Sequence, residues 1–219
     1  IYITGYTDGD LDGQINHGSN DAFISKFNAN ISLINENIDA GSTVATLSTT
    51  DVDASDSHTY SLVSGTGDTD NDAFTIEGSN LKINSSPDYE NKSSYSLRLK
   101  TTDSGSLTYE EEITLSVNDV NEVATDISLT SKGFNENMDT GSRVTTLSTI
   151  DEDASDIHTY TLVSGTGDTD NDSFTIEGSN LKINSSPDFE TKSSYSVRLK
   201  TTDSGGLSYE EAVTFEVND

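Results

Sequence analysis

An internal repeat with a period of 100 residues constrains this 219-residue chain more than any other feature. Residues 36–119 align with residues 136–219 without a gap, and 66 of the 84 aligned positions are identical. Most of the differences keep side-chain volume, as at Tyr89 and Phe189, and a protein core tolerates changes of that kind. The repeat therefore predicts two copies of one domain of about 100 residues.

Each copy has the alternating pattern of β-strands. In SYSLRLKTTD, Tyr95, Leu97 and Leu99 fall on one face of a strand, and EEITLSVND continues the pattern with Ile113 and Leu115. Shorter strands are predicted in TVATLST, HTYSLV, AFTIEG and NLKIN, with Gly, Asn, Asp and Ser in the turns between them. About seven short strands in a domain of this size are typical of an antiparallel sandwich. The predicted fold is all-β, with two tandem Greek-key seven-stranded β-sandwiches.

The composition limits the classes of partner. The net charge of −28 repels nucleic acid and anionic lipid and attracts cations, although a solvated acidic surface adapted to salty water gives the same excess. The absence of cysteine excludes disulfides and thiolate chemistry. No apolar run approaches the roughly 18 residues of a membrane span, so no direct insertion of this segment is expected. The start at Ile1 without a Met favours a fragment of a larger secreted protein.

Residues 1–28 lie outside the repeat. They contain two short strand-like runs around a Gly/Asp/Asn loop and resemble part of a blade of the bacterial β-propeller repeat called SBBP. The end of this leader is expected to supply the first strand of copy one. The predicted domains are the leader at 1–28, the first repeat at 29–120 and the second repeat at 121–219.

Acidic residues recur at the ends of the predicted strands in both copies. Loops of a sandwich gather at its two poles, so acids that are distant in sequence are expected to converge there. A chain that uses carboxylate and amide oxygens without Cys ligands suits Ca²⁺, with Mg²⁺ as the second choice because it requires a stricter octahedral shell. The residues are Glu36, Asp51, Asp53, Asp88, Glu90, Asp103, Asp119, Asn121 and Glu122 in copy one, and Glu136, Asp151, Asp153, Asp188, Glu190, Asp203 and Asp219 in copy two.

The ordered set of motifs resembles the cadherin repeat, in its bacterial form, over about residues 30–219. The motifs are NEN, DYE, the linker DVNE, DED and DSG. The resemblance implies Ca²⁺ ions between successive sandwiches that stand end to end. The implied inter-repeat ligands are Glu36, Asp88, Glu90, Asp119, Asn121, Glu122, Asp151, Asp153 and Asp203. Weaker partial sites are implied at Asp51, Asp53, Asp103, Glu136, Asp188, Glu190 and Asp219.

The linker departs from the family pattern. Glu122 stands where the family has Asp, and Val123 stands where it has Asn, a position at which the family uses a backbone carbonyl. Ala124 and Thr125 follow where Pro is usual, so a less stiff junction is expected. The chain has no Trp, and strand exchange by a buried Trp is therefore unsupported.

Two other motifs are candidate sites. The run DTDND, with Asp68, Asp70 and Asp72 in copy one, resembles the start of an EF-hand loop but lacks its Gly and distant Glu. A solvated turn is the favoured interpretation, and an extra cation site is the alternative. His58 and His158 are interpreted as structural because no Ser or Cys motif accompanies them.

The predicted function is a calcium-binding adhesion or spacer module of an extracellular or cell-surface bacterial protein, without enzymatic activity. Its expected partners are Ca²⁺ and like domains. The alternative is a carbohydrate-binding appendage of a polysaccharide-degrading protein, with surface polysaccharide as its partner.

Overall fold

The computed structural model describes residues 26–29, 33–51 and 56–219, and for 26–29 it describes the backbone alone. The chain divides into two compact units at Val120 and Asn121. Most of the predicted propeller-like leader and the candidate ligand Asp53 lie outside the described residues. In the described part of the chain, no helix is long and apolar enough to cross a membrane.

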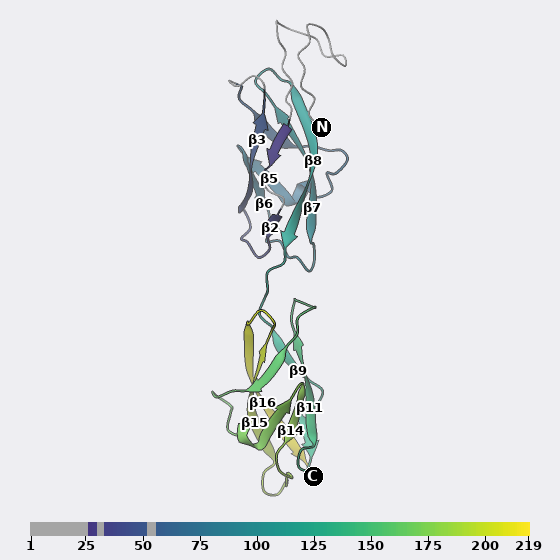
Figure 1. Cartoon of the computed structure of the whole chain (residues 1–219), viewed down its shortest axis with the longest axis vertical. Helices are drawn as coiled ribbons and strands as arrows, with labels where there is room; N and C mark the ends of the chain where they lie inside the picture. The colour runs from purple at the N-terminus through teal and green to yellow at the C-terminus, as the bar shows by residue number, and fades with distance from the viewer. Residues whose placement is uncertain (1–25, 30–32, 52–55) are drawn as a thin grey trace. The chain divides into compact units, whose positions relative to one another are not determined.

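The first unit is a sandwich of two four-stranded sheets, with the order β1-β3-β6-β5 in one and β2-β8-β7-β4 in the other. Figure 1 shows β3, β5 and β6 on one side of this unit and β7 and β8 on the other. All neighbours pair antiparallel except β2 and β8, which are parallel. The strands are β1 Lys26–Ala29, β2 Leu33–Asn35, β3 Thr43–Thr50, β4 Thr59–Leu62, β5 Phe74–Glu77, β6 Asn80–Ile83, β7 Ser94–Thr102 and β8 Thr108–Asn118.

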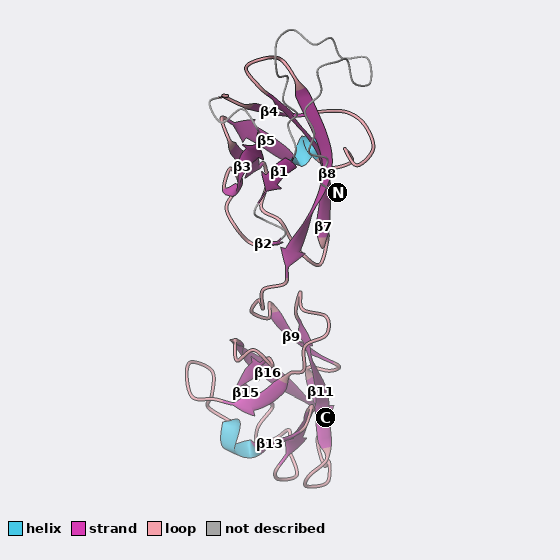
Figure 2. Cartoon of the chain, turned by 45° about the horizontal axis from the view of Figure 1, so that its top comes forward, coloured by secondary structure: helices cyan, strands magenta, loops and turns pink. Residues whose placement is uncertain are grey.

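The second unit repeats this topology, with the sheet orders β9-β11-β14-β13 and β10-β16-β15-β12. Its strands are β9 Asp126–Leu129, β10 Gly133–Asn135, β11 Arg143–Ile150, β12 Thr159–Leu162, β13 Phe174–Glu177, β14 Asn180–Ile183, β15 Ser194–Thr202 and β16 Ser208–Asn218. A short 3₁₀ turn directly precedes β5 in the first unit and β13 in the second. These turns are η1 at Asn71–Ala73 and η2 at Asn171–Ser173 (Figure 2). The predicted all-β class with two tandem sandwiches is confirmed.

The first strand of each sandwich is divided between the two sheets, which gives eight strand segments where seven were predicted. In the second unit, β9 pairs antiparallel with β11, and β10 pairs parallel with β16 in the opposite sheet. At the crossing, the Ser131 hydroxyl donates to the Gly133 carbonyl over 2.6 Å and accepts from the Gly133 amide. This local exchange satisfies backbone groups that leave one ladder before they join the other. A short polar break of this kind has no clear alternation signal in sequence.

Both sheets of each unit line its core, and the two longest strands contribute alternate residues to it. In β15 every second residue from Tyr195 to Thr201 is buried, as the period-two pattern predicts. The second core is more aromatic than the first because Phe134 and Phe215 replace Ile34 and Leu115. The Phe134 and Phe215 rings lie 6.3 Å apart between centroids, and both contact Phe174. These sandwiches hold the loops at their poles in fixed places.

Candidate metal centres

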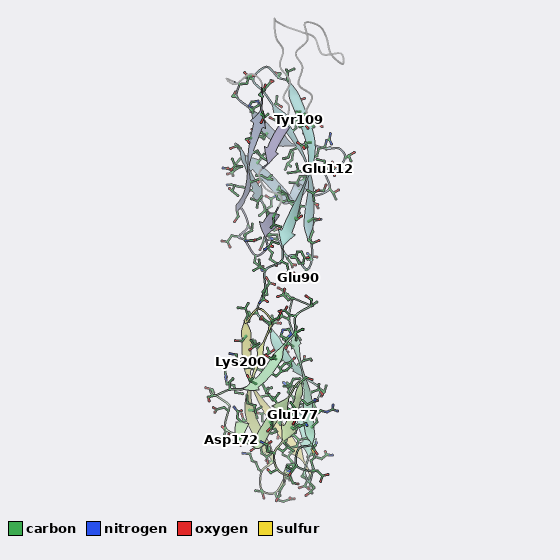
Figure 3. The ribbon with its side chains drawn as sticks, viewed as in Figure 1. Glu90, Tyr109, Glu112, Asp172, Glu177 and Lys200 are labelled. Atoms are coloured by element: carbon green, nitrogen blue, oxygen red, sulfur yellow. The ribbon has the colours of Figure 1, made fainter. Side chains whose placement is uncertain are left out.

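Three carboxylates meet at the C-terminal pole of the first unit, the end at which β8 terminates. Glu36, Glu90 and Asp119 each place one oxygen within 4.8 Å of the others. Glu36 is only 4% exposed, and its two carboxylate oxygens accept backbone hydrogen bonds from Tyr89 and from Val120, both over 2.7 Å. Glu90 and Asp119 are exposed, and Figure 3 shows Glu90 at this end of the unit. A fixed buried acid thus stands beside two solvent-facing acids.

The turn after β2 sets the position of Glu36. Its amide donates to the Asn118 carbonyl over 3.3 Å, and the next residue, Asn37, adopts a φ of 59° and donates to the Pro87 carbonyl over 3.0 Å. Asn tolerates this left-handed conformation better than most residues do. Asp88 Oδ1 accepts the Asn91 amide over 2.7 Å. Asp88 is not one of the three residues of this group.

The C-terminal pole of the second unit holds Glu136, Asp188 and Glu190 within the same limit of 4.8 Å. Here Asp188 accepts hydrogen bonds from both the hydroxyl and the amide of Thr191, over 2.9 and 3.2 Å. The hydroxyl bond is the main reason that the pKa of Asp188 is lowered, which keeps this exposed acid ionised. Asp219 does not belong to this group of three.

At the opposite, N-terminal pole of the first unit, Asp51, Asp56 and Asp103 converge within 4.8 Å. The Leu107 amide holds Asp103 over 2.8 Å, and the Ser104 hydroxyl holds Asp56 over 2.7 Å. Sequence reasoning missed Asp56. Its signal was the third acid of DVDASD, which recurs at the same place as Asp156 in DEDASD.

The linker residues bind to the N-terminal pole of the second unit. The Asn121 side-chain amide donates to Asp203 Oδ2 over 3.0 Å, and the Glu122 backbone amide donates to Asp153 Oδ2 over 2.8 Å. Asp153 and Asp203 are each 8% exposed, and the Asp153 amide donates to Asp151 Oδ1 over 3.3 Å. The structure therefore brings five of the predicted ligands together at one pole.

Gly205 makes room for the linker at this pole. A β-carbon at this position would lie 2.3 Å from Oδ1 of Asn121, a distance that no real contact allows. The surroundings of the neighbouring Asp203 favour its ionised form. Burial raises its pKa, but the hydrogen bonds from the Asn121 side chain and from the amides of Leu207, Gly206 and Gly205 outweigh burial, so the pKa of Asp203 is lowered.

Asp156 at the same pole carries an unsatisfied oxygen. Its Oδ1 accepts the Ser204 hydroxyl over 2.8 Å, whereas its Oδ2 is buried and accepts no hydrogen bond. Buried carboxylate oxygens ordinarily have partners, so this oxygen is a candidate ligand for a cation. His158 lies alongside, with Nε2 2.9 Å from Asp151 Oδ2, and His58 repeats the contact with Asp51 over 3.0 Å. These contacts tie both histidines to the poles.

Carboxylates at such distances repel one another. Two unit charges 4.8 Å apart repel by roughly 3 kcal/mol at an effective dielectric constant of about 20, and solvent and salt reduce this for the exposed members. A divalent cation removes the repulsion and completes the shell. Ca²⁺ accepts about six to eight oxygens in a flexible geometry, which suits clusters of carboxylates with an amide oxygen nearby.

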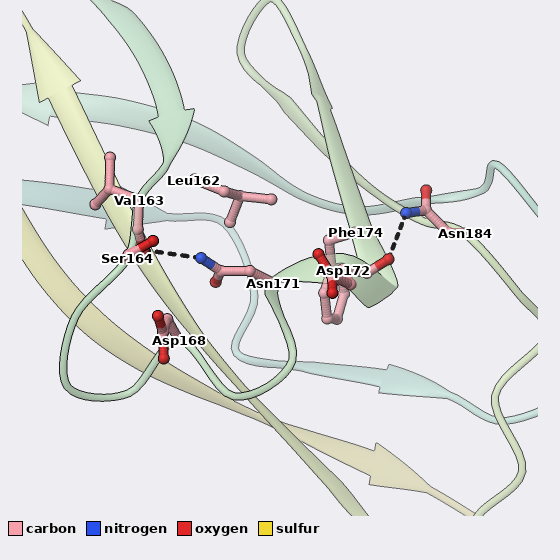
Figure 4. Close-up of a pocket in the computed structure, with 8 residues that line it drawn as sticks. All are labelled: Leu162, Val163, Ser164, Asp168, Asn171, Asp172, Phe174 and Asn184. Atoms are coloured by element: carbon pink, nitrogen blue, oxygen red, sulfur yellow. Dashed lines mark hydrogen bonds between the residues drawn. The ribbon is translucent and has the colours of Figure 1, made fainter.

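The DTDND loops are occupied by structural bonds. Asp170 pairs with Lys192 over 2.7 Å and accepts the Ser196 amide over 2.8 Å, and Asp168 accepts the Gly165 amide over 2.9 Å. Beside this loop in the second unit is an open pocket of about 650 Å³, where Asn171 donates to the Val163 carbonyl and Asn184 donates to the Asp172 carbonyl (Figure 4). The three aspartates of this loop form no metal-ligand group in the described part of the chain. The extra cation site is therefore unsupported, and the loop is an ordered turn rather than a merely solvated one.

The first copy has a recognisable family signature. Residues 32–118 match the cadherin domain family. The second copy shares most of its sequence with this matched region through the internal repeat. None of the curated protein sequences matches the chain.

Solved cadherin ectodomains share the fold. The chain is similar to human protocadherin-24 EC1-2, with a TM-score of 0.66 at 22% identity, over 89% of this chain and 97% of that one. It is also similar to domains 3–6 of protocadherin gamma B2, with a TM-score of 0.60 at 20% identity over 85% of this chain, and to the protocadherin gammaB4 extracellular domain, with a TM-score of 0.59 at 23% identity over 88%. The chain spans 45% and 32% of the lengths of these two. Two tandem cadherin-like sandwiches are thus the shared architecture.

Proposed function

We propose that this chain is a calcium-binding adhesion or spacer module in which Ca²⁺ binds at the junction of the two units and makes it rigid. The observation that carries the proposal is the division of the linker between two acidic clusters. Asp119 belongs to the carboxylate group of the first unit, while Asn121 and Glu122 bond to Asp203 and Asp153 of the second. A single residue, Val120, separates the two sets.

The covalent chain limits how far apart these ligands can be. Consecutive Cα atoms are about 3.8 Å apart across a trans peptide, so the Cα atoms of Asp119 and Asn121 are tethered within about 7.6 Å. Ions bound on either side of Val120 can therefore share ligands. The proposed junction set is Glu36, Asp88, Glu90, Asp119, Asn121, Glu122, Asp151, Asp153 and Asp203. Asp56 is added to the weaker partial sites. Asp156 is added to the ligands at the N-terminal pole of the second unit.

Without Ca²⁺ the carboxylates on both sides of Val120 repel, and the linker becomes a hinge. With Ca²⁺ the ligands of the first and second units are held by the same ions, and the sandwiches stand end to end. A rigid tandem module serves as a spacer or presents an adhesive face outside the cell. Its proposed partners are like domains, by analogy with a protocadherin gammaB7 fragment that forms a cis-dimer. No catalytic role is proposed for His58 or His158, because each is bonded to an aspartate of a pole.

Double electron–electron resonance tests the rigidity. Spin labels are placed on exposed strand positions, one at Thr114 in β8 and one at Thr175 in β13. The proposal predicts a broad distance distribution in EDTA and a narrow one in millimolar Ca²⁺, with Mg²⁺ much less effective. Sedimentation velocity on the unlabelled chain then measures self-association with and without Ca²⁺. Identical distributions in EDTA and Ca²⁺ would contradict the stiffening role.

A further inference from the structure

A histidine holds one acid at the N-terminal pole of each unit. In the second unit, Nε2 of His158 lies 2.9 Å from Oδ2 of Asp151. The first unit repeats the contact over 3.0 Å between His58 and Asp51. The side chains of His158 and Asp151 are only 12% and 3% exposed, and a carboxylate buried to this degree needs hydrogen bonds. An ionised carboxylate has no proton to donate, so the imidazole donates its Nε2 proton to the aspartate.

The histidine uses one oxygen of the aspartate and leaves the other to the pole. Oδ1 of Asp151 accepts the backbone amide of Asp153 over 3.3 Å, a long hydrogen bond. A carboxylate oxygen has two lone pairs, so this oxygen can also bind a cation. In the first unit the equivalent aspartate, Asp51, belongs to the carboxylate group that includes Asp56 and Asp103. The acid held by the histidine is thus a member of a candidate metal centre.

A group of hydroxyls connects the strands beneath the pole of the second unit. Thr149 Oγ1 lies 2.9 Å from the hydroxyl of Tyr160 and 2.8 Å from Oγ1 of Thr201, which is fully buried. These residues belong to β11, β12 and β15, so the bonds join the two sheets, and the first unit repeats both bonds. The three hydroxyl residues lie two positions from Asp151, His158 and Asp203 in turn. The strand ends that carry the histidine and its aspartate are therefore fixed relative to each other.

We propose that His158 is a positioning residue for Ca²⁺ at this pole, because its Nε2–H fixes the Asp151 carboxylate before the ion binds. This inference rests on the proposed function, in which Asp151 is a ligand. Ca²⁺ takes oxygen ligands, so the imidazole acts on the ion only through the aspartate. Hydrogen bonds that orient metal ligands commonly contribute about 10–100-fold to metal affinity.

Calorimetric Ca²⁺ titration of the full chain tests this role with two substitutions that separate ring packing from hydrogen bonding. His158→Phe keeps a ring of similar size without a donor, whereas His158→Gln keeps an N–H donor at about the same reach from the backbone. We expect His158→Phe to weaken the tightest sites by about 10–100-fold and His158→Gln to retain most of the affinity. Equal affinities in wild type and His158→Phe, or equal losses in the two variants, would overturn the positioning role.

His58→Phe is the matched control in the first unit. It removes the same hydrogen bond from Asp51, which lies at the pole away from the linker, so the tightest sites should bind as in the wild type. Amide spectra in EDTA show whether each variant is folded. A loss of the tightest sites in His58→Phe as large as that in His158→Phe would contradict a local effect on Asp151.

The protonated nitrogen of His158 gives a readout that does not depend on calcium. In EDTA, the ¹⁵N chemical shifts of the imidazole should show a proton on Nε2, and a ring with its proton on Nδ1 alone would overturn the proposal. The calorimetry also separates this inference from the proposed function. If Asp153→Ala abolishes the tightest sites while His158→Phe binds like the wild type, only the positioning role fails. If the wild type binds no Ca²⁺, the proposed function fails and the positioning role fails with it.

Discussion

At the scale of single residues, the position of Asn121 against the second unit depends on the absence of a side chain at Gly205. We predict that Gly205→Ala destabilises the second unit by about 1–3 kcal/mol, because the added methyl overlaps Asn121. Gly105→Ala is the matched control, since a β-carbon there meets only Asp103, at an ordinary 3.4 Å. Urea unfolding with and without Ca²⁺ measures both variants. Equal losses in the two variants would show that the glycine matters for a reason other than the linker.

The hydrogen bond from Asn121 to Asp203 predicts a pH dependence. A lowered pKa stabilises the fold above the unfolded value, near 4 for Asp, and that contribution is lost as the pH falls through the folded-state pKa. In EDTA, wild type should therefore be more stable than Asn121→Ala at pH 7, and the difference should shrink below about pH 4. Asp203→Asn serves as the control without a titrating group. A difference that is constant from pH 7 to pH 3 would contradict this reasoning.

Residue types and spacing were sufficient to predict the acids at the poles, but not their grouping. Glu36 and Asp119 lie 83 positions apart, and their grouping is what the resemblance to the cadherin repeat implied. Asp88 stays a proposed member of the junction set, and its Oδ1 also accepts the Asn91 amide. Asp56 was missed because it lies between predicted strands, where no alternating pattern records the position of a side chain. Hydrogen bonds to loop amides decide such choices, and no periodic pattern records them.

At the scale of elements, strand alternation predicted the sheets well because each long strand buries one face. The division of the first strand was not predicted, because pairing with both sheets depends on how the sandwich closes. The two copies also fill their cores differently at the equivalent positions Leu115 and Phe215, which lie on the inward face of the last strand.

This difference gives a reciprocal prediction. Phe215→Leu should destabilise the second unit by about 1–2 kcal/mol, since it leaves a void beside Phe134 and Phe174. Leu115→Phe should destabilise the first unit by about 1–3 kcal/mol, because its site is already fully buried and filled around a smaller side chain. When Ile34→Phe is added to Leu115→Phe, the loss of stability should differ from the sum of the two single losses, since the second unit uses Phe at both positions. Denaturant midpoints at constant m-value measure these effects, and a neutral Phe215→Leu would argue against aromatic packing as the source of stability.

At the scale of the whole molecule, calcium should stabilise the folded chain by mass action, because the unfolded chain has no assembled cluster. With affinities of about 10⁻⁴–10⁻³ M, typical of extracellular modules, 10 mM Ca²⁺ should raise stability by roughly 1.5–3 kcal/mol per site. Thermal unfolding across a Ca²⁺ series measures the shift, and equimolar Mg²⁺ is the control. A thermal unfolding midpoint that does not change with Ca²⁺ concentration would show that Ca²⁺ does not bind preferentially to the folded state.

The central claim, that the two units share their ions, is tested most directly by calorimetric Ca²⁺ titration of Glu90→Ala and Asp153→Ala. These residues belong to different units, and Glu190→Ala is the matched control for Glu90→Ala at the pole that lies away from the linker. The account predicts that both Glu90→Ala and Asp153→Ala abolish the tightest sites, whereas Glu190→Ala leaves those sites intact. If Asp153→Ala removes only sites that Glu90→Ala retains, each unit binds its own ions and the shared junction is wrong.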